Sequence, residues 1–335
     1  MVRRASLLPG VTLAALVAVV ATVLGHALPL VGAPVFGIVI GVAIALIRPP
    51  DARFGPGLAV ASRTVLQIAI VVLGTGLSLG EVLRVGRGSL PVMLGTLAVA
   101  LVGAHFLGKA LRVPGDARLL IGVGTGICGA SAIAAVTAVV DVAEAEVAYA
   151  VGTIFLFNVV AVLIFPPIGH LLGLSQHAFG LWAGTAINDT SSVVAAAYSY
   201  GHSAGATAVV VKLTRTLMII PIVLGLSWWT SRRTLVESGG AGRRAVPWRR
   251  VVPPFLVGFA VASLLDTLGF VPDGWHHALA TSAVFLITVA LAAIGLSTRP
   301  DRLRASGVRP LLLGGLLWAA VATSSLLLQA ATGNW

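Results

Sequence analysis

The chain has 335 residues, of which 58% are hydrophobic and only 10% are charged. Soluble domains average about 25% charged residues, so this composition, with a mean hydropathy of +1.02, excludes an ordinary soluble protein and indicates an integral membrane protein. The formal net charge of +11 would suit a nucleic-acid partner, but the placement of the basic residues gives it another explanation.

Eleven apolar segments follow one another along the chain, and we count each as a membrane span, because about 20 helical residues cross the hydrocarbon core. The first follows the basic start MVRR and has no clear cleavage site after it, so we predict a retained span rather than a signal peptide. We expect one membrane domain over residues 1–335, with a basic loop at about 230–250. The expected spans are 7–27, 31–48, 57–79, 90–109, 118–139, 147–173, 177–199, 204–229, 252–270, 277–297 and 308–331.

The basic residues favour one orientation of these spans. With a cytoplasmic N-terminus, 17 of the 22 lysines and arginines fall in cytoplasmic loops, whereas only Arg84 and Arg87 fall in outer loops. Lysine and arginine accumulate in cytoplasmic loops, so we predict a cytoplasmic N-terminus and an outer C-terminus. Anionic lipid is then the expected partner of the basic charge, and no nucleic acid is needed. The three remaining basic residues, Arg63, Lys212 and Arg215, fall within spans.

Two stretches resemble each other at an offset of 219 residues. GLSLGEVLRVGRGSLPVMLGTL at 76–97 matches GLSTRPDRLRASGVRPLLLGGL at 295–316, with eight identical positions. The expected topology places the two copies upside down relative to each other. Inverted repeats of this kind are typical of secondary transporters, whose substrate sites lie near the membrane midplane.

A second internal repeat has an offset of 60 residues. GTGICGASAIAA at 124–135 and GTAINDTSSVVA at 184–195 share glycine, threonine, isoleucine, serine and alanine at matching places. Both are runs of small residues inside a span, so we expect two broken helices that cross the membrane. Counting spans makes these two helices parallel, whereas an inverted repeat requires them to be antiparallel, and the sequence does not reconcile the two repeats.

Polar residues gather at one depth in the seventh and eighth spans. Asp189 lies near the centre of one, and Lys212 and Arg215 share a helix face near the centre of the next. A charged side chain at the membrane centre costs about 2.5–3.5 kcal/mol on insertion scales, so it needs a partner or a wet cavity. A structural ion pair between Asp189 and one of the cations is one explanation. It leaves one cation unpaired and does not explain the adjacent residues, which are Asn188, Thr190, Ser191 and Ser192.

The functional explanation is an anion site. Arginine offers a fork of donors and lysine a mobile point charge, and both suit an oxyanion. Hydroxyl groups of Thr190, Ser191 and Ser192 and main-chain N–H groups at half-helix starts would complete the cage. Asp189 is then the candidate site for a coupling proton or sodium ion. The histidines have no metal-ligand spacing and no nucleophile with an acid–base pair falls in the spans, so we expect neither a metal, nor a cofactor, nor an enzyme.

Three segments, GTGICGASAIAA, AINDTSSVVAAA and VVVKLTRTLMIIP, resemble the signature segments of the YeiH family of bacterial membrane proteins, which are described as sulfate exporters. The resemblance covers nearly the whole chain. It implies an all-α polytopic transporter of the bacterial inner membrane, in the broad superfamily of cation/proton antiporters and bile-acid symporters, with a core of broken crossing helices and a scaffold. The motif residues carried over are Gly126, Cys128, Gly129, Ser131, Asn188, Asp189, Thr190, Ser191, Ser192, Lys212 and Arg215.

The leading hypothesis is therefore a secondary transporter of a small oxyanion such as sulfate. One alternative is a cation/proton antiporter that uses Asp189, and another is a membrane scaffold whose polar cluster is purely structural. As partners we expect the oxyanion and the lipid bilayer, with a homodimer as a candidate oligomer.

Overall fold

A computed structural model of the protein describes residues 7–27, 32–137, 139–226, 228, 254–297 and 308–334. All regular structure in these residues is helical, which confirms the predicted all-α fold. In chain order the elements are α1 (Leu8–Ala27), α2 (Ala33–Ile47), η1 (Ala52–Phe54), α3 (Gly55–Val60), η2 (Ala61–Val65), α4 (Leu66–Gly74), α5 (Leu79–Ala110), α6 (Gly115–Gly126), α7 (Ala130–Val136), α8 (Glu144–Leu171), α9 (Gln176–Ala186), α10 (Thr190–Tyr200), α11 (His202–Thr216), α14 (Pro254–Thr267), α15 (Asp273–Leu296) and α17 (Val308–Ala331). The expected basic loop at 230–250 lies outside the described residues.

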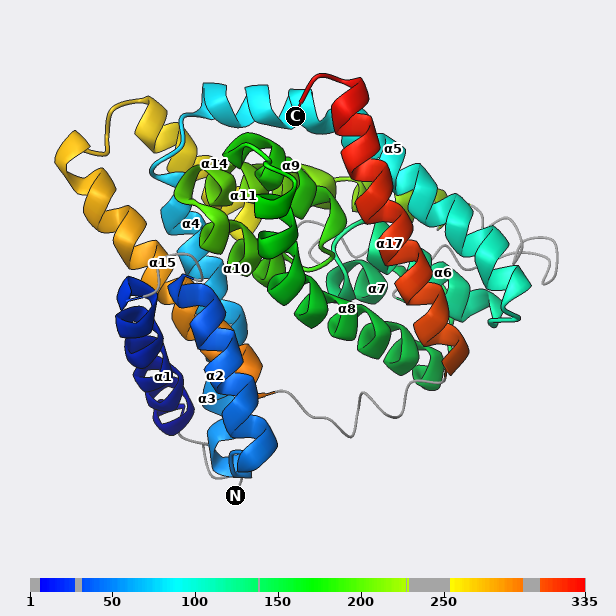
Figure 1. The fold of residues 1–335 in the computed structure, drawn as a ribbon, viewed down its shortest axis with the longest axis horizontal. Helices are drawn as coiled ribbons and strands as arrows, with labels where there is room; N and C mark the ends of the chain where they lie inside the picture. The colour runs from blue at the N-terminus through cyan, green and yellow to red at the C-terminus, as the bar shows by residue number, and fades with distance from the viewer. Residues whose placement is uncertain are drawn as a thin grey trace.

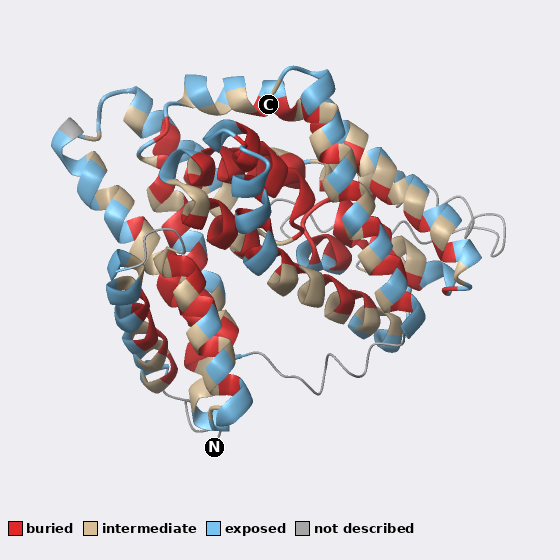
Figure 2. Cartoon of the chain, viewed as in Figure 1, coloured by how far each residue is buried: buried red, intermediate tan, exposed pale blue. Residues whose placement is uncertain are grey.

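Seven helices of the described chain are long and apolar enough to cross a membrane, and α2 and α14 are shorter apolar helices. The rod from η1 to α4 counts as one of the seven, and the helix that starts as α11 continues to Leu226. Large apolar side chains are exposed on outer helices, among them Leu16 of α1 and Leu327 of α17. Figure 2 shows buried residues concentrated in the central helices and exposed turns along the outer ones. Exposed apolar surface of this extent is expected of helices that face lipid.

The helices form two bundles, seen side by side in Figure 1. One bundle holds α1, α2, the rod from η1 to α4, α14 and α15, and the other holds α5 to α11 with α17. The long helix α5 joins them, because its first part runs across the top of the view before the helix turns downward (Figure 1). Ser78 caps this helix by accepting a hydrogen bond from the Glu81 N–H, and Pro91 lies inside it, where a proline removes a main-chain hydrogen bond and favours a bend.

Helix α1 begins at the opposite end of the molecule from the end at which α17 finishes (Figure 1). We call the end at which α1 begins the N-side and the end at which α17 finishes the C-side. The units of the longer repeat run in opposite directions between these two sides. The end of α4 meets the start of α15 around one small cavity, and α5 passes α17 with Gly95 near Leu328 and Gly103 near Leu317. This antiparallel arrangement agrees with an inverted repeat, although residues 298–307 of the second copy lie outside the described chain.

The segment 177–199 folds back on itself instead of crossing. Helix α9 runs inward from the C-side, and α10 returns to the same side. The Tyr200 hydroxyl at the end of α10 donates to the Leu174 carbonyl just before α9, at 2.5 Å, and its ring stacks on Phe179 at 3.8 Å. Gln176 accepts a hydrogen bond from the Ala204 N–H, at the start of α11. The pair α9–α10 is therefore a re-entrant hairpin, which we call the C-side hairpin.

The segment 118–139 also returns to the side from which it enters. Apolar residues of α7 cluster with those of α6, of the first turns of α8 and of the last turns of the helix that begins as α11, all at the N-side. Ile133 of α7 lies against Gly124 of α6, and α8 begins at the N-side only a short loop after Val136. We call α6–α7 the N-side hairpin. The two expected crossings are thus two hairpins that enter from opposite sides, which leaves seven long and two short helices as the crossing elements of the described chain.

Candidate functional site

The tips of the two hairpins meet in the middle of the second bundle. The N-side tip is the turn 127–129 and the C-side tip is the turn 187–189. A Cβ atom on Gly129 would lie 3.6 Å from the Cβ of Asp189. Gly129 has a φ of +66°, a left-handed conformation that glycine adopts without strain, which explains why the chain turns there.

Helix α8 fixes the C-side tip through one amide side chain. The Oδ1 atom of Asn158 accepts hydrogen bonds from the main-chain N–H groups of Asn188, at 3.0 Å, and Asp189, at 3.3 Å. Asn158 is 3% exposed and lies near the middle of α8. These two hydrogen bonds make Asn158 a link between helices that positions the tip.

Lys212 and Arg215 are completely buried on α11, which passes beside both tips. The Nζ of Lys212 donates to the Ile127 carbonyl at 2.9 Å and to the Ile187 carbonyl at 2.7 Å. The guanidinium of Arg215 donates to the carbonyls of Gly126, at 2.7 Å, of Thr125, at 3.3 Å, and of Thr185.

All of these acceptors lie at the carboxyl ends of α6 and α9. Such carbonyls have no partner within their own helix, and together they carry the negative end of the helix dipole. The two cations therefore complement the carboxyl ends of both inward-running half-helices. Among the described residues, no ion pair joins Asp189 to Lys212 or Arg215.

The shorter internal repeat has a direct structural meaning. Arg215 binds the carbonyls of Thr125 and Thr185, and Lys212 binds those of Ile127 and Ile187. Each pair consists of residues that match at the offset of 60 positions. Because the hairpins enter from opposite sides, the matched segments are antiparallel, as an inverted repeat requires. The conflict between the two repeats disappears once both segments are hairpins.

The amino ends of α7 and α10 meet at the same tips, next to Gly129 and Asp189. Asp189 caps α10, because its carboxylate accepts hydrogen bonds from the Ser192 N–H at 2.9 Å, from the Ser192 hydroxyl at 2.6 Å and from the Ser191 hydroxyl. Ser131, at the start of α7, is exposed, and Thr190 and Ser191 are partly exposed. The amino ends are therefore the accessible part of the tips, whereas the two cations are sealed.

One buried side chain at the C-side tip has no partner. Asn188 is 1% exposed, and neither its amide nitrogen nor its amide oxygen makes a hydrogen bond in the described structure. Leaving such a buried group unsatisfied costs about 1–3 kcal/mol. Native proteins retain unsatisfied groups of this kind mainly where a ligand, a water molecule or a functional demand accounts for them.

The eleven residues selected from the sequence motifs all lie in the two tips, in the helix ends next to them, or on the stretch of α11 that passes beside them: Gly126, Cys128, Gly129, Ser131, Asn188, Asp189, Thr190, Ser191, Ser192, Lys212 and Arg215. Their role in binding stays a prediction. Sequence reasoning missed two supports of the site. One is the set of carbonyls that hold the cations, which no side-chain pattern reveals. The other is Ser325 of α17, whose hydroxyl lies 2.7 Å from that of Thr185.

The described residues contain no group of three or more histidine, cysteine or acidic side chains arranged to hold a metal ion. Cys128 is buried within the N-side tip. The polar side chains of the tips and of the adjoining helix ends therefore carry amide, hydroxyl and carboxylate groups. The side chains of Lys212 and Arg215 lie buried beside them.

Comparison with known proteins identifies the family. A family model described as conserved hypothetical protein 698 matches residues 9–314. The chain is 42% identical over 337 residues to a UPF0324 membrane protein of Streptococcus pyogenes serotype M3, with 98% of each chain covered. It is 40% identical over 344 residues to a UPF0324 membrane protein of Fusobacterium nucleatum, covering 97% of this chain and 98% of the relative. The chain is therefore a multi-pass membrane protein that belongs to the conserved hypothetical protein 698 family, the YeiH/UPF0324 family.

Proposed function

We propose that this protein is a secondary transporter that moves a small oxyanion, such as sulfate or an organosulfonate, across the bacterial inner membrane. The observation that carries the proposal is the amino end of α10 at Asp189, which meets the opposite tip at Gly129 beside the unpartnered amide of Asn188. Helix amino ends attract anions through free N–H groups and through the positive end of the helix dipole.

Lys212 and Arg215 act in this proposal as positioning residues. Both are completely buried and donate to carbonyls of both hairpins, so in this proposal they hold the two tips together and do not wrap the substrate.

Asp189 gives the proposal a coupling mechanism. An anion that arrives at the amino end of α10 meets the Asp189 carboxylate, and two like charges in one site repel each other. Protonation of Asp189 removes that repulsion and turns the carboxyl into a donor. We therefore propose that the anion and a proton bind together, whichever direction of transport the cell uses.

The hairpins also suit alternating access. They reach the same point from opposite sides of the molecule, so a substrate held at the tips is near both sides, and movement of one bundle against the other would expose it to each in turn.

Flux through proteoliposomes tests the proposal. Purified protein should accumulate labelled sulfate when an inward proton gradient is applied. Asn188→Ala should abolish this flux, because its amide is the unpartnered group at the tip. Ser324→Ala is the matched control, since that hydroxyl donates only to a carbonyl of its own helix, and it should retain the flux. Absence of sulfate and organosulfonate flux from folded protein would reject the proposal.

A second candidate is a sodium/proton antiporter. The observation in its favour is the cluster of oxygens from Asp189, Ser191 and Ser192, because sodium prefers oxygen ligands. Sodium-dependent proton movement that is lost in Asp189→Asn, without any sulfate flux, would assign this activity.

If the polar cluster is purely structural, the protein should move neither ion, and every tip variant should fail to fold.

A further inference from the structure

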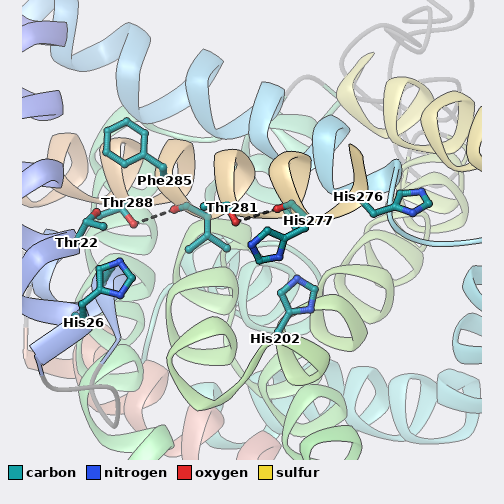
Figure 3. Close-up of a pocket in the computed structure, with 12 residues that line it drawn as sticks. Thr22, His26, His202, His276, His277, Thr281, Phe285 and Thr288 are labelled. Carbon is teal, nitrogen blue, oxygen red and sulfur yellow. Dashed lines mark hydrogen bonds between the residues drawn. The ribbon is translucent and has the colours of Figure 1, made fainter. Parts of the chain in front are cut away.

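A separate pocket lies between the two bundles at the C-side, and Figure 3 shows it in close-up. Its volume is about 590 Å³. The walls come from the end of α1 and the first part of α15 in the first bundle, from the start of α2, and from the start of α11 in the second. Pockets that bury small ligands usually have volumes of about 300–1,000 Å³, so this one is large enough for a ligand well above the size of sulfate. It shares no lining residue with the hairpin tips.

Histidines dominate the polar part of this lining. Four of the seven histidines of the chain line the pocket, although they come from three different helices: His26, His202, His276 and His277. Figure 3 shows the rings of His202 and His277 beside each other, with His26 on the opposite wall. His276 points away from this group, and its Nε2 lies 2.7 Å from the Asp266 carboxylate.

The rest of the lining is apolar or already bonded. The hydroxyls of Thr22, Thr281 and Thr288 donate to carbonyls of their own helices, so they offer no free hydrogen to a ligand. Phe285 and Val284 supply apolar surface. Among the described residues, the lining of the pocket contains no aspartate, glutamate, lysine or arginine.

The titratable groups that face the histidines are few. On α10, Tyr198 presents its ring to His202 at 5.7 Å, and on α14 Asp266 pairs with His276. Helix α2 contributes Ala33, which does not titrate. Among the described residues that line the pocket, the histidines are thus the groups that can carry a charge.

We propose that this pocket binds a small organic anion, a sulfonate or carboxylate with an apolar body. The ring N–H groups of His202 and His277, which lie beside each other, hold the acid group, and the body lies against Phe285 and Val284. A histidine ring donates one hydrogen bond when neutral and two when protonated, so a pair of such rings suits an acid group. A ligand there touches both bundles and stabilises the arrangement in which they are seen.

Binding of benzenesulfonate to the purified full-length protein in detergent tests this proposal by isothermal titration at pH 5.5 and pH 8.0. We expect binding at pH 5.5 that weakens about tenfold or more at pH 8.0, equivalent to about 1.4 kcal/mol. His202→Gln and His277→Gln should each weaken binding at pH 5.5. Ala280→Leu should also weaken it, because it fills the cavity without changing a histidine. His177→Gln, an exposed histidine at the start of α9 on the same side and outside the pocket, should bind as the unmodified protein does.

Two outcomes would overturn the proposal. One is an equal affinity for benzenesulfonate at pH 5.5 and pH 8.0. The other is that His177→Gln weakens binding as much as His202→Gln and His277→Gln do. A further arm adds phosphatidylglycerol, whose headgroup is also an organic anion. Binding of this lipid in the pocket without any binding of benzenesulfonate would assign the site to lipid and reject the soluble ligand. Sulfate flux through the hairpin tips is measured independently, so this result leaves the transport proposal untouched.

Discussion

Thr125 and Thr185 lie 60 positions apart in the sequence, yet both direct their main-chain carbonyls at the guanidinium of Arg215. The two threonines end half-helices that come from opposite sides of the molecule. A single arginine thus bridges the two hairpins, and Lys212 repeats the arrangement one turn away at Ile127 and Ile187. The consequences of this bridge can be tested.

Arg215→Lys should destabilise the protein. The guanidinium reaches three carbonyls through three separate nitrogens in one planar fork, whereas a lysine would present a single nitrogen at another position, so buried carbonyls lose their donors. Each hydrogen bond to a charged group contributes about 1.5–3 kcal/mol, so a clear fall in melting temperature in detergent is expected. Arg309→Lys, at the exposed start of α17, is the control and should melt as the unmodified protein does. An unchanged melting temperature in Arg215→Lys would contradict the bridge.

Gly129→Ala, in the N-side tip, should destabilise the protein more than Gly173→Ala, in a loop, does. Both glycines have positive φ, +66° and +64°, so both substitutions carry backbone strain of about 1–2 kcal/mol. Only at Gly129 would the new Cβ also crowd a neighbour, at 3.2 Å from Ile154, whereas nothing lies within 4 Å at Gly173. Thermal unfolding of the two variants gives the comparison. Equal losses of stability would mean that crowding at the tip is unimportant.

The two buried asparagines should respond in opposite ways. Asn158→Ala removes the acceptor of two buried N–H groups, so we expect a loss of stability of about 1–3 kcal/mol. Asn188→Ala removes an amide that has no partner, so the melting temperature should stay the same or rise while transport is lost. Melting curves recorded with flux assays on the same preparations make the distinction. A strong destabilisation by Asn188→Ala would show that its amide is structural.

The hairpin topology predicts which loops share a side of the membrane. In a Cys128→Ala background, single cysteines at Gly173 and Ser203 should react with an impermeant maleimide from the same side, and one at Asp141 from the other. All three positions are exposed. If the segment 177–199 crossed the membrane, Gly173 and Ser203 would lie on opposite sides. Labelling of intact and inverted membrane vesicles therefore decides between the two topologies.

Composition and span length were sufficient to predict an all-α polytopic membrane protein, because a bilayer requires about 20 apolar residues for each crossing helix. The motifs also selected residues that do lie together, since the small-residue runs that break a helix are visible in a sequence. The number of crossings was not predictable in the same way. A segment of about 23 residues with a break in the middle has the same composition whether the chain crosses the membrane or turns back. The segment 177–199 is such a case, and it turns back.

What the sequence determined by itself is the class of protein, its family and the two runs at which helices break, because these depend on composition and local conformation. Only the tertiary structure decided that both runs turn back, that Lys212 and Arg215 bind main-chain carbonyls, and that four distant histidines line one pocket. The physical reason is that main-chain carbonyls are the same in every residue. Which of them a buried cation meets depends on how helices far apart in the chain pack together.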